Sequence, residues 1–269
     1  MTLLGERPAI GGLLRTWRQT RRLSQLELSS VSGVSSRHLS FIETGRSRPS
    51  REMVLRLADE LEVPLRERNM LLQAAGFAPA YGETSLDAPE MSAVREAIDT
   101  VLRAHMPYPA LVFDARWNMV RSNDAIALFT AGLPAHLLGA EANAMRIALH
   151  PDGLAPHLVD HAAVRARFLH RMRRQAAATG DAVIAALADE CEAYPHPDEP
   201  AEVRPNSDIV TPLRLRRDGR ILNIFSTIAT FGTATDLTVA ELSIETFFPA
   251  DAETAAYLVA AAEQFATAA

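Results

Sequence analysis

The sequence lacks several features that would mark other classes of protein. It has no lysine, so all 27 of its basic residues are arginine, and Cys191 is its single cysteine. One cysteine excludes an internal disulfide framework and is typical of a reducing compartment. No apolar run approaches the roughly 20 residues of a membrane span, and residues 1–12 lack the basic-then-apolar pattern of a signal peptide. We therefore expect a cytoplasmic protein with no membrane partner.

The composition supports hydrophobic cores. The chain has 269 residues, of which 48% are hydrophobic. This length suits one large domain or two ordinary ones, and this apolar content argues against wholesale disorder. No internal repeat of fixed period is visible, so the sequence gives no sign of a repeat architecture.

The formal net charge of −6 is unevenly divided along the chain. Residues 1–80 contain 12 arginines and 8 acidic residues, whereas residues 81–269 contain 15 arginines and 25 acidic residues. Between residues 10 and 49, seven arginines are opposed only by Glu27 and Glu43. A basic region on an acidic protein indicates a polyanionic partner, and the alternative is a solvated arginine face.

The first 75 residues predict five short helices with apolar faces. Ser24 followed by Glu27 has the spacing of a capping box and begins the second helix. The turn at residues 32–34 ends it, and Ser35 or Ser36 caps the third. Two helices separated by so short a turn are typical of a helix-turn-helix.

The remainder mixes strands and helices. Residues 108–124 predict strand, turn, strand, with Asn123 or Asp124 capping a following helix. Three further strands are expected at 209–215, 221–230 and 239–248, with a hairpin turn at Asp218-Gly219. We predict an α+β fold similar to the PAS-like fold, in which helices cover one antiparallel sheet and enclose a small cavity.

These patterns predict the following domain organisation. A five-helix DNA-binding domain occupies residues 1–78, and a linker rich in glycine, proline and small residues occupies 79–92. The α+β domain spans 93–250, and residues 251–269 form a helical tail.

A helix-turn-helix places its second helix in the major groove of DNA, which assigns roles to particular side chains. Gln25, at the start of the first helix of the motif, can hold a phosphate. Hydroxyls and one guanidinium on the second helix can reach base edges, and two arginines after that helix are placed for phosphates. The expected DNA contacts are Gln25, Ser35, Ser36, Arg37, Ser40, Arg46 and Arg48.

The stretch LSQLELSSVSGVSSRHLSFIETGRSRPS resembles the lambda-repressor-like, xenobiotic-response-element family of DNA-binding domains. The shared elements are the Ser-Gln start, the glycine turn, the hydroxyl-rich recognition helix and the Ile-Glu-x-Gly-x-x-x-Pro ending, and the match covers about residues 10–75. The resemblance implies a lambda-repressor-like all-α domain in which Arg18 pairs with Glu43. It also implies a homodimer on a double-stranded DNA operator with inverted-repeat symmetry.

The second half resembles the MmyB-like ligand-binding domain over about residues 95–250. The resemblance is carried by VFDARWNMVRSNDA, by LHPDGLAPHLVDHAAVRARFLHRMRRQ, and by LRLRRDGRILNIFSTIATFGTATDLTVAELSIETFFP. It implies a PAS-like pocket that can hold a fatty acid such as myristate, and no other cofactor. Together the two halves imply a bacterial transcription regulator, mainly a repressor, whose operator binding responds to a hydrophobic small molecule.

Candidate pocket residues are the apolar positions of the sheet and its covering helices, although each can instead be an ordinary core residue. A carboxylate would also need a cation, for which Arg146, His150, Arg167 and Arg171 are the candidates, with no basis in the sequence for a choice. The apolar candidates are Val112, Trp117, Phe129, Phe168, Met172, Ile224, Phe225 and Ile244.

Catalysis and metal binding have little support. His157 and His161 have the spacing of two metal ligands on one helix, but no HExxH motif and no cysteine pair accompany them, so no metal is predicted. No nucleophile motif such as GxSxG is present, so we expect no enzyme. Two alternatives for the second half remain, namely a dimerisation module without ligand and a hydrolase fused to a DNA-binding module.

Overall fold

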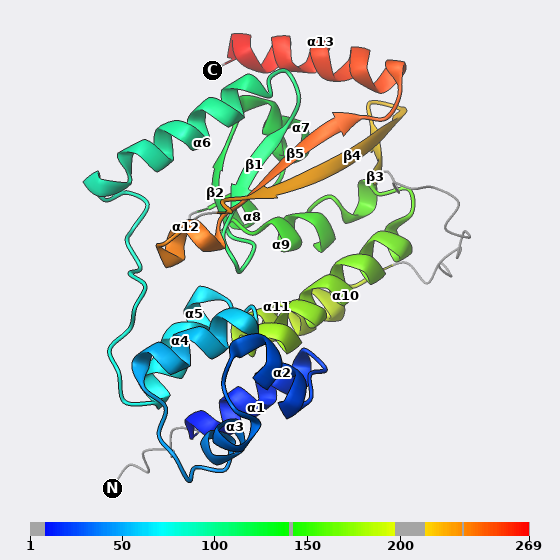
Figure 1. Cartoon of the computed structure of the whole chain (residues 1–269). Coiled ribbons are helices and arrows are strands. Elements are labelled where there is room, and N and C mark those ends of the chain that lie inside the picture. The colour runs from blue at the N-terminus through cyan, green and yellow to red at the C-terminus, as the bar shows by residue number, and fades with distance from the viewer. Residues whose placement is uncertain (1–8, 140–141, 197–212, 233, 269) are drawn as a thin grey trace, which may run out of the picture. The chain divides into compact units, whose positions relative to one another are not determined.

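The structure is a computed structural model that describes residues 9–139, 142–196, 213–232 and 234–268 (Figure 1). The chain divides into two compact units. The first comprises Met1–Thr84 together with Ala234–Leu237, and the second comprises Ser85–Thr233 together with Thr238–Ala269. In the part of the chain that the structure describes, no helix is both long and apolar enough to cross a membrane.

The first unit contains the five expected helices, and local chemistry sets where they begin and end. The predicted capping box is confirmed, because the Ser24 hydroxyl accepts a hydrogen bond from the Glu27 N–H while the Glu27 carboxylate accepts one from the Ser24 N–H. Gly33 ends the second helix with a φ of 66°, and Ser35 caps the third. The helices are α1 (Ile10–Thr20), α2 (Gln25–Ser32), α3 (Ser36–Glu43), α4 (Arg51–Glu60) and α5 (Leu65–Ala74).

The helices of the first unit meet around one hydrophobic core. Its buried members include Leu14, Leu39, Ile42 and Leu57. At Gly11, helix α1 approaches the end of α3 so closely that a Cβ atom would lie 2.3 Å from the Ile42 carbonyl oxygen. A side chain at this position would therefore displace α3.

The second unit is built on one five-stranded sheet in which every pair of neighbouring strands is antiparallel. The strand order is β2-β1-β5-β4-β3, so the last strand of the chain lies in the centre. The predicted hairpin turn is confirmed, with positive φ values at Asp218 and Gly219. The strands are β1 (Ala110–Phe113), β2 (Met119–Ser122), β3 (Leu213–Arg217), β4 (Arg220–Thr230) and β5 (Ser243–Pro249). The predicted α+β fold is confirmed.

Helices cover both faces of this sheet. On one face Val112 and Ile244 pack against Ile98 and Leu102 of α6. On the other face Leu111 packs in a cluster with residues of α9, α10 and α11. After the first unit's helices the chain forms η1 (Pro89–Met91), α6 (Ser92–Ala104), η2 (Asp124–Ile126), α7 (Ala127–Thr130), α8 (Ala135–Leu138), α9 (Ala144–Leu149), η3 (Ala155–His157), α10 (His161–Thr179), α11 (Ala182–Ala193), α12 (Leu237–Glu241) and α13 (Ala252–Ala268).

The strand predicted at 239–248 begins too early. Residues up to Glu241 form α12, and β5 starts at Ser243. Ser243 pairs with Phe113 on one side and Thr230 on the other, and both partner strands end there. Earlier residues have no strand to pair with, so a helical turn satisfies their backbone groups. The strand predicted at 209–215 starts outside the described residues.

The predicted cap after β2 is also wrong. Asn123 precedes η2, but its side chain makes no capping bond. Its amide oxygen instead accepts a hydrogen bond from the Ala110 N–H, and its amide nitrogen donates to the carbonyls of Leu102 and Tyr108. A buried asparagine that joins α6 to β1 satisfies more backbone groups than a cap would.

Gly11→Ala should destabilise the first unit, with the neighbouring Gly12→Ala as its matched control. We expect Gly11→Ala to lower the free energy of unfolding by about 2 kcal/mol or more, because the new methyl group collides with backbone. A Cβ at Gly12 would meet nothing within 4 Å, so Gly12→Ala should stabilise by a few tenths to about 1 kcal/mol.

The measurement is urea unfolding followed by Trp17 fluorescence in a Trp117→Phe background, because these are the two tryptophans of the chain. Equal effects of the two alanines would contradict the close approach of α1 to α3.

Candidate DNA-binding surface and ligand cavity

Helix α3 presents the residues expected to read DNA. Ser35, Ser36 and Arg37 are exposed, and Ser40 is half-buried on the same helix. The Ser35 hydroxyl also accepts the His38 N–H, so it caps α3 while remaining at the surface. Leu39 and Ile42 point the opposite way, into the core. The amphipathic pattern of α3 therefore turns its hydroxyls and Arg37 outward.

Two arginines cluster around an aromatic ring on the same helix. The guanidinium of Arg37 lies 5.4 Å and that of Arg46 lies 5.9 Å from the centre of the Phe41 ring. Arg46 and Arg48 are both exposed. Arginines that rest on a ring keep their N–H groups directed to solvent, where phosphates can accept from them.

A buried ion pair fixes the orientation of α3. Arg18 donates to both carboxylate oxygens of Glu43, at 2.6 and 2.8 Å, and also to the Leu23 carbonyl. Burial by itself would raise the pKa of Glu43, but hydrogen bonds from Arg18 and Gln25 hold it below its usual value. The Arg18 guanidinium binds both carboxylate oxygens, so this pair ties the end of α3 to α1 with a defined geometry.

Gln25 is part of this network. Its amide donates to Glu43 Oε2 at 2.8 Å, so one of the N–H groups expected to face a phosphate is engaged inside the protein. The side chain therefore links the start of α2 to the end of α3. A phosphate at this position could accept hydrogen bonds from the first backbone N–H groups of α2 and from the second N–H of the Gln25 side-chain amide.

The second unit contains an apolar space, called here the inner cavity. Its volume is about 80 Å³, below the roughly 300–1,000 Å³ of small-molecule sites, so a larger occupant would have to move its walls apart. The sheet, α7, α9 and α10 supply its walls. The lining residues used below are Leu111, Phe129, Ala148, Phe168, Glu245 and Phe247.

Glu245 is the ionisable residue among those lining the inner cavity. Burial raises its pKa, against the smaller lowering effects of a hydrogen bond from Ser226 and of the charge on Arg171. The Ser226 hydroxyl donates to Glu245 Oε1 at 2.6 Å. The cavity therefore favours a neutral carboxylic acid at this position. Glu245 pairs with Leu111 on the sheet face that α9, α10 and α11 cover, and the residue is half-buried.

Two of the apolar residues predicted for the pocket, Phe129 and Phe168, line the inner cavity. Met172 and Ile224 are fully buried in adjacent core clusters. Trp117 stacks on Phe113 with 4.5 Å between ring centres. The remaining three lie on the opposite face of the sheet, where Val112 and Ile244 pack beneath α6 and Phe225 stacks on Phe248.

The predicted cations differ in their surroundings. Arg146 donates to both carboxylate oxygens of Glu190, each at 2.8 Å. His150 accepts a hydrogen bond from the Asp152 N–H and packs against Tyr194. Arg167 is exposed on α10. Arg171 lies 4.3 Å from the centre of the Trp117 ring.

The histidines with metal-ligand spacing do not share a helix, since His157 ends η3 and His161 begins α10. Within the described residues, one group with suitable atoms within 4.8 Å of one another is His136, His150 and Asp152. The His150 Nδ1 in this group already accepts a backbone hydrogen bond. Cys191 is fully buried, and burial raises its pKa to about 12, which keeps its thiol protonated and unreactive.

A helix-turn-helix unit joined to an α+β unit with an apolar cavity defines a DNA-binding protein with a separate ligand-binding domain. Residues 9–71 match the family model of a helix-turn-helix domain, and residues 94–260 match that of the MmyB-like transcription regulator ligand binding domain. The second match covers more than half of the chain. The chain therefore belongs to the family of transcription regulators with an MmyB-like ligand-binding domain.

Other comparisons add little. No curated protein matches the chain. A solved structure of an RNA-binding light-oxygen-voltage receptor is similar over 97% of this chain and 62% of that chain, with 16% sequence identity and a TM-score of 0.27. A likeness at this level bears on neither ligand nor partner.

Glu245→Gln should raise the melting temperature of lipid-stripped protein at pH 8. The folded state binds more protons than the unfolded state wherever the pH lies between the two pKa values, so wild-type stability falls as the pH rises through that window. Glutamine keeps the shape without the charge. The advantage should vanish as the pH falls towards about 4.3, the unfolded value for glutamate.

Glu190→Gln is the matched control with the opposite sign. The hydrogen bond from Arg146 lowers the pKa of Glu190, so this variant should melt at a lower temperature at pH 8, with the loss shrinking in acid. A pH-independent effect of Glu245→Gln would show that its carboxyl group is not held in its neutral form.

Proposed function

We propose that this regulator is a homodimeric repressor that binds an inverted-repeat operator and is controlled by a hydrophobic small molecule. In this proposal α3 reads the bases, Arg46 and Arg48 hold phosphates, and the inner cavity holds the ligand. A fatty acid such as myristate suits the cavity's apolar walls. The protein would act in the cytoplasm, where its operator lies.

The inner cavity is the observation that carries the ligand half of this proposal. A dimerisation module without ligand needs only a filled core, whereas the inner cavity leaves about 80 Å³ of apolar space unfilled. Unfilled apolar space costs about 24 cal/mol for each Å³ of closed cavity, so a hydrophobic occupant stabilises the unit.

Regulation requires that the ligand distinguish two states of the protein. A ligand shifts operator occupancy only by the difference in its affinity for the DNA-binding and non-binding forms, typically about 1–3 kcal/mol. A dimer provides such states, because the spacing of its two recognition helices must match the spacing of the half-sites.

Arg37→Ala should weaken operator binding by about 1–3 kcal/mol and relax the preference at one base pair. Arg46→Ala and Arg48→Ala should each weaken binding to all sequences alike and reduce the slope of log affinity against log salt by about one unit. The measurement is binding to duplexes selected from a random pool, at several salt concentrations.

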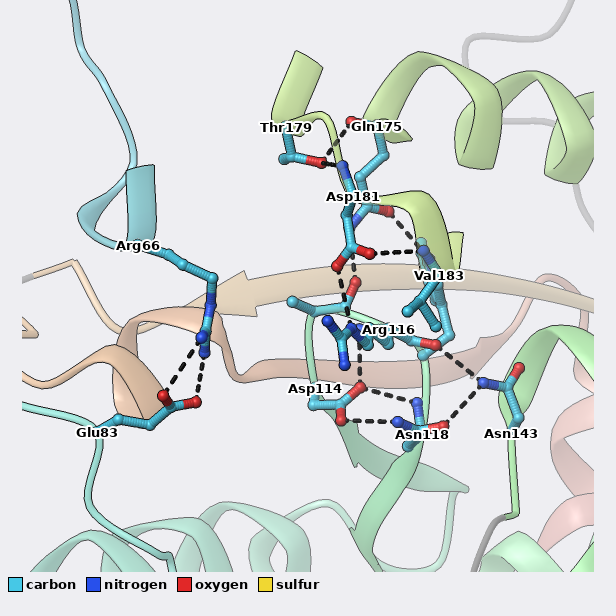
Figure 2. Close-up of polar contacts among 12 residues, drawn as sticks. Arg66, Glu83, Asp114, Arg116, Asn118, Asn143, Gln175, Thr179, Asp181 and Val183 are labelled. Carbon is cyan, nitrogen blue, oxygen red and sulfur yellow. Dashed lines mark hydrogen bonds and ion pairs between the residues drawn. The ribbon is translucent and has the colours of Figure 1, made fainter. Parts of the chain in front are cut away.

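The matched control is Arg66→Ala, because Arg66 bonds to Glu83 within the first unit (Figure 2). It should leave operator affinity nearly unchanged. Uniform weakening by Arg37→Ala would make Arg37 a phosphate contact, and unchanged salt slopes would remove Arg46 and Arg48 from the interface.

Ala148→Phe should abolish both ligand binding and ligand control, because the new ring fills the inner cavity. In the wild-type protein, saturating myristate should change operator affinity at least about fivefold, the lower end of typical couplings. Ala177→Phe adds the same ring at an exposed position of α10 and should behave as wild type. Native and denaturing mass measurements report whether a fatty acyl species is bound.

An unchanged operator affinity at saturating ligand would overturn the regulatory claim. A ligand that binds Ala148→Phe as tightly as wild type would place the binding site elsewhere.

A further inference from the structure

Three side chains with metal-binding atoms meet away from both the DNA-binding surface and the inner cavity. His136 Nε2 lies 3.9 Å from Asp152 Oδ2, and His150 Nδ1 lies 3.8 Å from the same oxygen. The two imidazole rings are edge to face, with 5.3 Å between their centres. One ligand atom from each of the three residues lies within 4.8 Å of the other two. The three residues are called here the histidine cluster.

Apolar packing brings the members of the histidine cluster together. Leu137 of α8, the residue after His136, is buried in one core cluster with Ile147 and Leu154 (Figure 1). Those two residues flank the turn at 150–153, which carries the other two members. The polar groups are therefore neighbours because the core beneath them holds α8 against this turn.

The backbone of the turn is closely held. The Gly153 N–H donates to the His150 carbonyl, and the Leu154 N–H donates to the Ile147 carbonyl. A Cβ at Gly153 would lie 2.3 Å from that Ile147 oxygen, so the turn requires glycine. His150 and Asp152 thus extend from a fixed backbone, which reduces the entropy lost when they bind a ligand.

The His150 ring has support of its own. It packs edge to face on Tyr194 with 4.8 Å between ring centres, and the Tyr194 hydroxyl donates to Glu190. Arg146 donates to both oxygens of that same carboxylate. Neighbours that fix the orientation of a ligand side chain strengthen metal binding.

The Nδ1 atom of His150 offers a lone pair on the side of Asp152. It accepts the Asp152 N–H at 3.0 Å, which selects the tautomer with no proton on this nitrogen. An imidazole nitrogen without a proton is the form that binds a metal ion. A cation would take this lone pair from the N–H group, and one neutral hydrogen bond is a small loss beside three metal–ligand bonds.

The separations and the ligand types fit one class of cation. Atoms that bind one zinc ion at about 2.0–2.2 Å in tetrahedral geometry lie about 3.3–3.6 Å apart, a few tenths of an ångström closer than in the histidine cluster. His136 and Asp152 are exposed, so their side chains can turn to close this difference. Imidazole suits Zn²⁺ and similar transition ions, whereas Mg²⁺ and Ca²⁺ prefer oxygen ligands.

We propose that His136, Asp152 and the Nδ1 atom of His150 bind a divalent transition cation of the zinc class, which joins α8 to the turn after α9. Three protein ligands leave the remaining coordination positions to water. This site goes beyond the proposed function and does not depend on it.

The test is titration of the tag-free, metal-stripped full chain with Zn²⁺ in competition with a fluorescent chelator, and with Mg²⁺ in parallel. Wild-type protein should bind Zn²⁺ at least about a hundredfold more tightly than Mg²⁺, because two of the three ligands are imidazoles. Zn²⁺ should also slow backbone hydrogen exchange in α8 and in residues 150–154, because the cation joins these two segments.

His136→Ala and Asp152→Asn should each weaken Zn²⁺ binding at least about tenfold, since even the loss of a residue that only orients a ligand typically costs about 10–100-fold. The matched control is His170→Ala, which removes an exposed histidine of α10 and should leave the affinity unchanged. The slowing of hydrogen exchange should be absent in His136→Ala.

Unchanged Zn²⁺ affinity in both His136→Ala and Asp152→Asn would overturn the proposed site. Equal weakening by His170→Ala would mean that Zn²⁺ binds exposed histidines in general. Binding of Mg²⁺ as tight as that of Zn²⁺ would contradict a site with imidazole ligands. Zn²⁺ binding that leaves hydrogen exchange in α8 and in residues 150–154 unchanged would place the metal elsewhere.

Discussion

The second unit depends on the position of β5, which is the last strand in the chain and the central one in the sheet. Because helices cover both faces of the sheet, each side chain of this central strand packs into the core on one face or on the other. Ile244 packs against α6, and Glu245 and Phe247 line the inner cavity. Because side chains alternate along a strand, a shift of one residue would exchange the two sets and empty the cavity of its carboxyl group.

In the first unit the corresponding constraint is the Arg18–Glu43 ion pair. Removing one partner of a buried pair typically costs about 3–5 kcal/mol, because the other charge is left without compensation. Its greater effect here is on geometry, since Glu43 is the last residue of α3 and Gln25 joins the same carboxylate from the start of α2. The two helices of the motif are thus fixed to one another and to α1 through a single side chain.

Features that depend only on residues close together in the sequence could be predicted from it. The capping box at Ser24 and Glu27 and the turn at Asp218-Gly219 are local chemistry, and both form as expected. The pattern of residues 239–241 fits a strand, but β1 ends at Phe113 and β4 at Thr230, so β5 can pair only from Ser243 onward. The place of Glu245 in the wall of the inner cavity depends on how α10 packs against the sheet. Helix α10 and strand β5 are separated in the chain by α11, β3, β4 and α12, so no local pattern indicates this contact.

The buried state of Cys191 has a practical consequence for work on this regulator. It is the single cysteine of the chain, and its side chain is inaccessible in the core formed with α10 and α11. Its raised pKa leaves almost no thiolate at neutral pH, so maleimide reagents would react with it very slowly. A cysteine introduced at an exposed position such as Ser36 or Ala177 would then be the one reactive thiol. A single spin label or fluorophore can therefore be placed on either unit without first removing a native residue.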